Sequence, residues 1–493
     1  MALAFNGDLE SLMDRARSGD AAAATQLAEH LRYGIGMDRD TQESLQWLLR
    51  AAEADYAPAQ YQLGLIYRDG DGVAHDQLQH LDWLMRAAAG GQHAAAMTLI
   101  GDCYRLGRGV ARDPAKAVQW YKLAAEKGHA RARYLLARAY ALGRGILRDR
   151  SLAVEWYRRS ARSGYSSAQY RLGLAYLHGQ GCERDPMQAV IWFDRAARQG
   201  HAGAQFRLAK ALLTGVGIQK QPSEAAQWLR CAAERGHLEA QYNLGYVYAY
   251  GVGVEKSDVE AIAWYRKAAC RKHADSQYAL GSFYLNGLGV ERDQTKAFRW
   301  LSRAAANGSV RAAYRLGRLY AAGAYSEKPM MHEARYWLEV AARGGHPRAP
   351  YRLGVVCARG MAGAKDFVAA YTWFYVAAAI TGDERALKLA EAVGGLLTAE
   401  ELEAAKDLAR RTWQEIGTRA RRSAAGKQVD EEARTTEDLE DVIDLPDSAE
   451  TSPVKVEDGD TSVHDDPQPL WVQDIDIAAI LNDATGEGRR PVL

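Results

Sequence analysis

Long apolar runs are missing from this chain of 493 residues. No stretch approaches the roughly eighteen apolar residues that a membrane-spanning helix needs, so we expect no membrane partner. The first residues, MALAFNGDLESLMDRARSGD, also lack the basic start and apolar run of a signal peptide. Both absences make a cytoplasmic protein the expectation.

Cysteine is scarce, and its spacing shows no regular pairing. The five cysteines form no C-x-x-C motif and occur at Cys103, Cys182, Cys231, Cys270 and Cys357. An odd and scattered count of this kind suits a reducing compartment.

Signatures of enzyme chemistry are missing as well. Strings such as GRGV and GVGV follow predicted helices and lack the strand and the Lys-Ser/Thr pair of a nucleotide-binding loop. The sequence contains no Ser-His-Asp context and no carboxylate pair at a concave site. We therefore expect no enzyme activity, no catalytic residue and no cofactor.

Histidine recurs at regular intervals but does not predict a metal site. It recurs just after the end of the predicted helix B, at His93, His129, His201, His237, His273 and His346. A metal needs ligand atoms within about 2 Å of one ion, whereas equivalent positions of stacked repeats lie roughly 10 Å apart. These histidines are expected to be structural turn residues.

Internal repetition dominates the rest of the sequence. Ten of the twelve tryptophans follow one another at steps of 36 or 37 residues: Trp47, Trp83, Trp120, Trp156, Trp192, Trp228, Trp264, Trp300, Trp337 and Trp373. A Leu or Ile precedes each by twenty or twenty-one residues: Leu27, Leu63, Ile100, Leu136, Leu172, Leu208, Leu244, Leu280, Leu316 and Leu353. Such a period is the signature of a solenoid.

One repeat, Ser167 to Gly200, predicts two helices. The first, helix A, carries an apolar side chain at every fourth position, at Ala168, Leu172 and Tyr176. An Asp-Pro pair at 185–186 then starts helix B, because the carboxylate caps free amides and proline suits the first helical position. One hairpin cannot bury both apolar faces, so repeats must stack. The predicted fold is all-α, a right-handed α-superhelix.

These residues follow the pattern A-x-Y-x-L-G-x-x-Y-x-x-G-x-G and then D-P-x-x-A-x-x-W-x-x-x-A-A-x-x-G. The pattern closely resembles the Sel1-like repeat, a relative of the tetratricopeptide repeat, over about Asp20 to Gly382. The resemblance implies about ten helical hairpins and an adaptor that assembles protein complexes. It implies no reaction. A cysteine-rich branch of the family has a disulfide in each repeat and some members linked with β-lactamase-type activity, but this chain lacks the paired cysteines.

Four segments are predicted along the chain. They are an N-terminal capping helix (1–19, helical from Asp8 to Ser18), ten repeats (20–382), C-terminal capping helices (383–426, with a capping box at Thr398 and Glu401 and a helix to Ile416), and a disordered acidic tail (427–493).

Charge separates the tail from the rest of the chain. Residues 427–493 hold nineteen acidic and five basic residues, a net charge of −14, whereas residues 1–426 carry +15. Two stretches of the tail, EDLEDVIDLP and LWVQDIDIAAILND, mix acids with apolar residues and are typical of short binding motifs that fold on a partner.

A stripe along the A helices is the candidate binding surface. Counting from the repeated Leu or Ile, positions −5, −1, +2 and +6 point away from the packing side and are expected to be exposed. The stripe residues are Arg131, Arg138, Arg171, Arg207, Lys210, Tyr246, Arg311, Arg315, Arg318, Arg348, Arg352 and Arg359. They are either solvating side chains whose stems cover apolar surface or the lining of a site for an acidic segment.

The predicted function is a non-enzymatic scaffold that binds a protein partner through the stripe. The partner is an acidic segment of another protein, or the chain's own tail, which otherwise serves only to keep the protein soluble. RNA binding by the basic repeats is the alternative, although the stripe shows no regular code and the aromatic residues of the repeats lie mostly at packing positions rather than on the stripe. A β-lactamase-type hydrolase is the second alternative.

Overall fold

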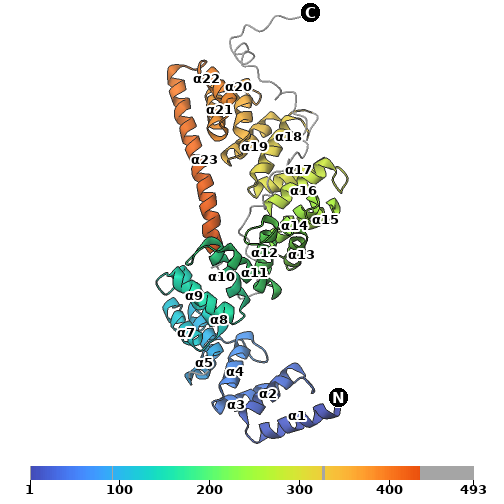
Figure 1. Cartoon of the computed structure of the whole chain (residues 1–493), viewed down its shortest axis with the longest axis vertical. Coiled ribbons are helices and arrows are strands. Elements are labelled where there is room, and N and C mark those ends of the chain that lie inside the picture. Colours follow the sequence, from blue (N-terminus) through green and yellow to red (C-terminus); the bar gives the residue numbers. More distant parts are fainter. Residues whose placement is uncertain (1, 91–92, 325–327, 434–493) are drawn as a thin grey trace, which may run out of the picture. The chain divides into compact units, whose positions relative to one another are not determined.

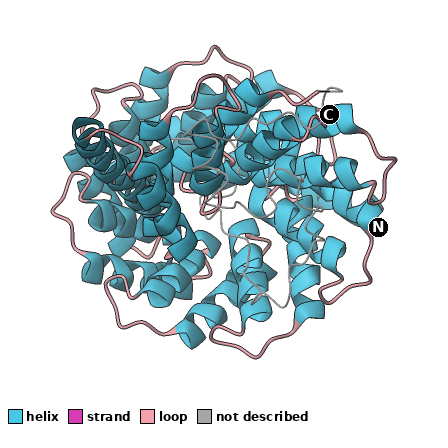
Figure 2. Cartoon of the chain, turned by 90° about the horizontal axis from the view of Figure 1, so that it is seen from above, coloured by secondary structure: helices cyan, strands magenta, loops and turns pink. Residues whose placement is uncertain are grey.

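The structure is a computed structural model that describes residues 2–90, 93–324 and 328–433. The described residues form helices and no strand (Figures 1 and 2), so the predicted all-α repeat fold is confirmed. The helices are α1 (Ala2–Arg17), α2 (Ala21–Tyr33), α3 (Thr41–Glu53), α4 (Ala57–Asp69), α5 (Gln77–Ala89), α6 (Ala94–Leu106), α7 (Pro114–Glu126), α8 (Ala130–Leu142), α9 (Arg150–Arg162), α10 (Ser166–His178), α11 (Pro186–Arg198), α12 (Ala202–Thr214), α13 (Pro222–Glu234), α14 (Leu238–Tyr250), α15 (Asp258–Cys270), α16 (Ala274–Asn286), α17 (Gln294–Ala306), α18 (Val310–Ala321), α19 (Met331–Arg343), α20 (Ala349–Arg359), α21 (Phe367–Thr381), α22 (Glu384–Gly394) and α23 (Ala399–Ala433).

Two compact units make up the chain. Unit 1 comprises residues 1–204 and 216–218, and unit 2 comprises residues 205–215 and those from 219 onward. In unit 1, each even-numbered helix from α2 to α10 is a helix A and packs on the helix B that follows it, and each helix B from α3 to α9 packs on the next helix A. In unit 2 the same order runs from α13 to α22, and α23 packs on α21.

Local sequence signals define the helix ends as predicted. The Asp185 carboxylate accepts hydrogen bonds from the backbone N–H groups of the first turn of α11, and proline occupies the first position of that helix. Gly179 ends α10 with φ +68°, a left-handed conformation that costs glycine little. Each hairpin is therefore set by residues within its own repeat.

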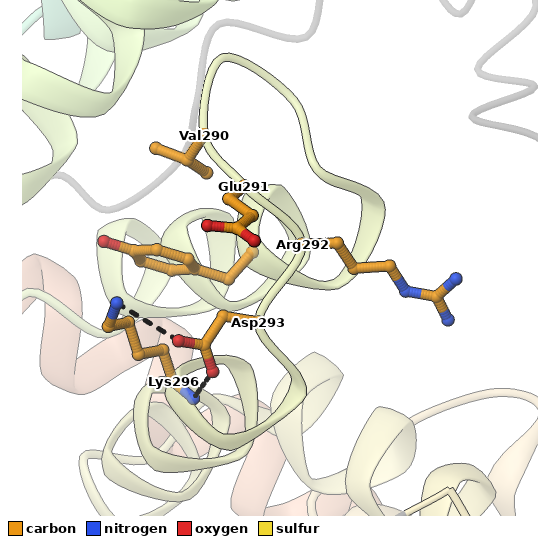
Figure 3. A pocket seen from close by; sticks show the side chains of 6 residues that line it. Val290, Glu291, Arg292, Asp293 and Lys296 are labelled. Carbon is orange, nitrogen blue, oxygen red and sulfur yellow. Dashed lines mark hydrogen bonds and ion pairs between the residues drawn. The ribbon is translucent and has the colours of Figure 1, made fainter.

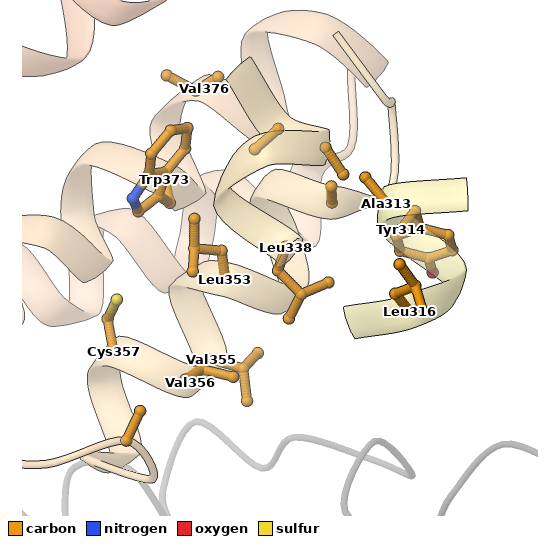
Figure 4. Close-up of a cluster of buried hydrophobic side chains, with 14 of the residues drawn as sticks. Ala313, Tyr314, Leu316, Leu338, Leu353, Val355, Val356, Cys357, Trp373 and Val376 are labelled. Atoms are coloured by element: carbon orange, nitrogen blue, oxygen red, sulfur yellow. The ribbon is translucent and has the colours of Figure 1, made fainter. Parts of the chain in front are cut away.

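The repeated apolar positions form the core. Leu136, Leu172 and Leu244 are fully buried, and Figure 4 shows their counterparts Leu316 and Leu353 in unit 2. The ten repeat tryptophans are buried or half-buried between helices. Glycine follows Leu172 because the neighbouring helix B leaves no room there: a Cβ at Gly173 would lie 2.5 Å from Phe193 Cε1.

A second glycine contact joins each loop to the preceding repeat. A Cβ on Gly145 would collide with the carbonyl oxygen of Pro114, in the first turn of the preceding helix B. The loops that contain Gly109, Gly181, Gly217, Gly253 and Gly289 make the same contact with the start of the preceding helix B. This contact fixes the register between neighbouring hairpins.

The terminal helices differ from the prediction in length. Helix α1 begins at Ala2, so Asp8 lies inside the helix and is not its cap. The capping box is present, since the backbone N–H of Thr398 donates to the Glu401 carboxylate at 2.9 Å. Helix α23 then continues beyond Ile416 to Ala433, because the added residues are mostly strong helix formers. Most of the predicted tail, residues 434–493, lies outside the described residues.

Candidate functional site

Histidines cap the A helices and stack on the preceding repeat. The Nδ1 atom of His201 accepts a hydrogen bond from the backbone N–H of Ala204 at 3.1 Å, and its ring stacks on Tyr170 with centroids 4.6 Å apart. His346 stacks in the same way on Tyr314 at 3.9 Å. The predicted structural role of these histidines is confirmed, and the sequence alone did not indicate the capping or the stacking.

The stripe residues are less exposed than predicted. Only Arg311 and Arg348 are fully exposed, whereas Arg207 and Arg352 are buried, with 7% and 8% of their surface accessible. The others are half-buried: Arg131, Arg138, Arg171, Lys210, Tyr246, Arg315, Arg318 and Arg359. The prediction of exposure was wrong for the buried pair because a helical wheel ignores the neighbouring helix. Arg352 Nε, for example, donates to the Tyr314 hydroxyl of α18 at 2.7 Å.

In unit 1 the stripe is neutralised or covers aromatic rings. Arg131 Nη2 lies 2.7 Å from Asp102 Oδ2. The other carboxylate oxygen, Oδ1, accepts a hydrogen bond from the Tyr121 hydroxyl at 2.7 Å. Arg138 and Arg171 each lie over a tyrosine ring of their own helix, at 5.7 and 5.9 Å from the ring centroid. This part of the stripe therefore offers little uncompensated charge.

The first A helices of unit 2 carry a different chemistry. On α14 the rings of Tyr246 and Tyr250 lie 4.4 Å apart, and Tyr250 is exposed. Glu239, at the start of α14, is buried with its carboxylate 3.3 Å from His273 Nε2. Acidic and aromatic residues of α14 interrupt the basic stripe here.

Six arginines of α18 and α20 form what we call the cationic face: Arg311, Arg315, Arg318, Arg348, Arg352 and Arg359. Within the described residues, Arg311, Arg318 and Arg348 belong to no ion pair. The buried Nε of Arg318 also donates to no acceptor there. The structure thus gathers these positive charges on two neighbouring A helices.

Titration behaviour reflects this concentration of charge. Burial lowers the pKa of Arg352, and the charges of Arg318 and Arg348 lower it further. Burial also lowers the pKa of His346 to about 4, with contributions from Arg348 and Arg311. Such repulsion destabilises the folded protein until an anion compensates it.

One sequence exception explains the position of Arg311. Ser309 replaces histidine as the cap of α18 and accepts from the backbone N–H of Ala312 at 3.3 Å. The histidine ring that would cover Tyr278 is therefore missing, and the guanidinium of Arg311 lies over that tyrosine at 4.7 Å.

A shallow cavity on α16 and α17 is structural. It has a volume of about 340 Å³ and is lined by Tyr284, Val290, Glu291, Arg292, Asp293 and Lys296 (Figure 3). Asp293 caps α17, accepting from the Lys296 backbone N–H at 2.8 Å, and pairs with the Lys296 ammonium at 3.1 Å. The backbone hydrogen bond and then the ammonium group lower the pKa of Asp293. The carboxylate of Asp293 and the ammonium of Lys296 are thus engaged with each other at the start of α17.

Among residues 2–90, 93–324 and 328–433, no group of three or more His, Cys, Asp or Glu side chains could hold a metal ion. None of the helices in this part combines the length and apolarity needed to cross a bilayer. The five cysteines are unpaired, and burial raises the pKa of Cys103 and Cys357 to about 11, which keeps both as thiols.

Ten consecutive segments match the model of the Sel1 repeat: residues 21–56, 57–92, 94–129, 130–165, 166–201, 202–237, 238–273, 274–309, 310–346 and 347–379. None of the curated proteins with which the sequence was compared matches it.

Several solved structures resemble the chain. The protein c5321, a protective antigen of uropathogenic Escherichia coli strains with an SLR fold, is 30% identical over 84% of this chain and 97% of its own, with a TM-score of 0.57. A Sel1 repeat protein from Oxalobacter formigenes is 31% identical over 64% of this chain and 93% of its own, with a TM-score of 0.47. The immunity protein Pa5087 from Pseudomonas aeruginosa is 24% identical over 44% and 81%, with a TM-score of 0.29.

Proposed function

Because this chain belongs to the Sel1 repeat family, we propose that it is a non-enzymatic scaffold that binds an acidic segment of a partner protein on the cationic face. Stacked helical hairpins of this kind are typical of protein-interaction scaffolds, since they present a long surface made by many equivalent positions. The partner-binding part of that surface is assigned to α18 and α20.

The observation that carries this proposal is the uncompensated charge of three arginines of the cationic face, Arg311, Arg318 and Arg348. Arg311 and Arg348 are exposed and Arg318 is half-buried, and none of the three has an ion-pair partner within the described residues. An arginine guanidinium binds carboxylates through paired hydrogen bonds in a fixed geometry. A peptide rich in Asp and Glu matches both the charge and the geometry of these donors.

The aromatic residues favour a peptide over RNA. Single-stranded nucleic acids are bound by aromatic side chains on which bases stack. In this chain Tyr170 and Tyr314 are already covered by histidine rings, and Tyr278 is covered by Arg311. The rings of Tyr278 and Tyr314 are therefore not free to receive a base.

Charge reversal on the full chain tests the proposal. The variant R311E/R318E/R348E is compared with R235E/R292E/R299E, which makes the same charge change at exposed positions elsewhere in unit 2. A fluorescein-labelled Asp/Glu-rich peptide and a labelled single-stranded RNA serve as probes in anisotropy titrations. We expect the first variant to bind the peptide at least about tenfold more weakly, and the control to bind it as the unaltered chain does.

Two outcomes contradict the proposal. Equal peptide affinity in the two variants would remove the cationic face as the binding site. Tight RNA binding that is lost in the first variant and falls steeply with salt, without matching peptide binding, would assign the face to nucleic acid instead.

A further inference from the structure

An acidic segment that suits the cationic face is present in the chain itself. Residues 437–466 contain twelve Asp and Glu and one Lys. They follow α23, which ends at Ala433 and belongs to unit 2 together with α18 and α20. Arg311, Arg318 and Arg348 therefore have a complementary partner in the same polypeptide.

Helix α23 lies against the repeats that carry the cationic face. Its Glu415 lies 3.8 Å from Arg343 Nη1, at the end of α19. A Cβ on Gly345 would lie 3.8 Å from Ile416 Cγ2, and Gly345 precedes Arg348 by only three positions. The final helix is thus anchored near the start of α20.

The segment can reach the face from that anchor. Between Ile416 and Ala433 the helix advances about 26 Å, at 1.5 Å per residue. Residues 434–456 alone can span up to about 75 Å when extended. The acids of residues 457–466 therefore reach Arg348 even if the end of α23 points directly away from it.

We propose that residues 437–466 bind the cationic face of the same chain and so compete with the acidic partner. The inference rests on the proposed function, because it assigns an internal competitor to that site. A tethered segment has an effective concentration in the millimolar range. A partner must then exceed the affinity of the segment, or engage it elsewhere, before it gains the site.

The test uses three full-length proteins. One is unaltered, one has the twelve acids of residues 437–466 changed to Asn and Gln, and one adds R311E/R318E/R348E to those changes. The probe is a labelled synthetic peptide with the sequence of residues 437–466, titrated by anisotropy at low salt. Circular dichroism and thermal melting verify that all three proteins are folded.

We expect the neutralised chain to bind the peptide about tenfold more tightly than the unaltered chain, because the internal competitor is gone. Adding the arginine reversals should abolish this binding. Sedimentation of the unaltered chain should show a monomer; a concentration-dependent dimer that the neutralised chain lacks would mean docking between copies and would overturn the intramolecular proposal.

Two other results overturn this inference. Equal affinity of the peptide for the unaltered and neutralised chains means that the segment does not occupy the face; if the arginine reversals still weaken binding, the proposed function stands. No binding of the peptide to the neutralised chain means that the segment does not fit the face, whatever other acidic peptides bind there.

Discussion

Single glycines set how closely neighbouring repeats approach. The loop glycine Gly145 touches the carbonyl of Pro114, whereas Gly164, at the end of α9, has nothing within 4 Å of its missing Cβ. Both have positive φ, +73° and +88°. Alanine substitutions at Gly145 and Gly164 therefore distinguish the cost of backbone strain, which both share, from the cost of a collision, which only Gly145 has.

We expect Gly145→Ala to lower the free energy of unfolding by about 2 to 4 kcal/mol, because left-handed strain adds to a collision with backbone atoms that cannot rotate away. Gly164→Ala should cost only about 1 kcal/mol, from strain alone. Urea unfolding of both variants measures the difference. Equal costs would show that the loop contact does not fix the register.

Histidine capping makes stability depend on pH. At His346, Nδ1 accepts a hydrogen bond from the backbone N–H of Arg348, in the turn before α20, only while it is unprotonated, and burial lowers the pKa of His346 to about 4. The unfolded chain, with a histidine pKa of about 6.5, therefore binds protons that the folded chain excludes. Stability is full above that value and falls as the pH drops toward 4.

The expected loss from His346 between pH 7 and pH 5 is at most about 2 kcal/mol, and His346→Ser should remove it. Serine is a suitable replacement because Ser309 occupies the equivalent position in the turn before α18. Chemical unfolding of both proteins at several pH values gives the two slopes. Identical slopes would mean that His346 does not contribute to the acid sensitivity.

Between helices, one buried ion cluster joins three elements of unit 1. Asp102 on α6 accepts from the Tyr121 hydroxyl on α7 and pairs with Arg131 on α8. Burial raises the pKa of Tyr121 well above its usual value, and the Asp102 charge raises it further, so the phenol stays protonated as the donor. The cluster couples a hairpin to the hairpin that follows it.

Asp102→Ala should lower the free energy of unfolding by about 3 kcal/mol, because it leaves a partly buried guanidinium and a buried hydroxyl without their acceptor. Asp82→Ala is the control, since it removes an exposed pair with Arg86 at 3.0 Å and should cost less than about 1 kcal/mol. Equal losses in urea unfolding would contradict a structural role for the cluster.

Sequence reasoning succeeded within each repeat and failed between repeats. Helix phase identified the core leucines, and the Asp185 cap was legible from an Asp-Pro pair. Phase could not show that Tyr314 of the preceding helix covers Arg352, because the two residues are 38 positions apart. The collection of arginines on α18 and α20 was visible in the sequence, but the lack of ion pairs at Arg311, Arg318 and Arg348 within the described residues required coordinates.

At the scale of the whole molecule, a stack of repeats needs a cover for the apolar side of its last repeat. Helix α21 buries Phe374 and Val376 completely, and α22 and α23 pack against it with Val393 and Ala405 fully buried. We propose that these last two helices form the C-terminal cap of unit 2. A solenoid without such a cap exposes an apolar face.

A chain that stops after Gly382 should melt several degrees lower than the full chain and aggregate, because it exposes the apolar side of α21. A chain that stops after Ala433 retains both helices and should melt at the temperature of the full chain. Differential scanning fluorimetry and light scattering measure both effects. Unchanged melting after the shorter truncation would contradict the capping role.

The loop glycine contacts also bear on how such a protein changes in length. Each contact joins a repeat only to the one before it, as Gly181 does with Arg150 and Gly217 with Pro186. After duplication or loss of one 36-residue unit, each of these loop glycines therefore still faces the start of a preceding helix B that it fits. Evolution can in this way lengthen the array and acquire new recognition positions while the existing ones stay intact.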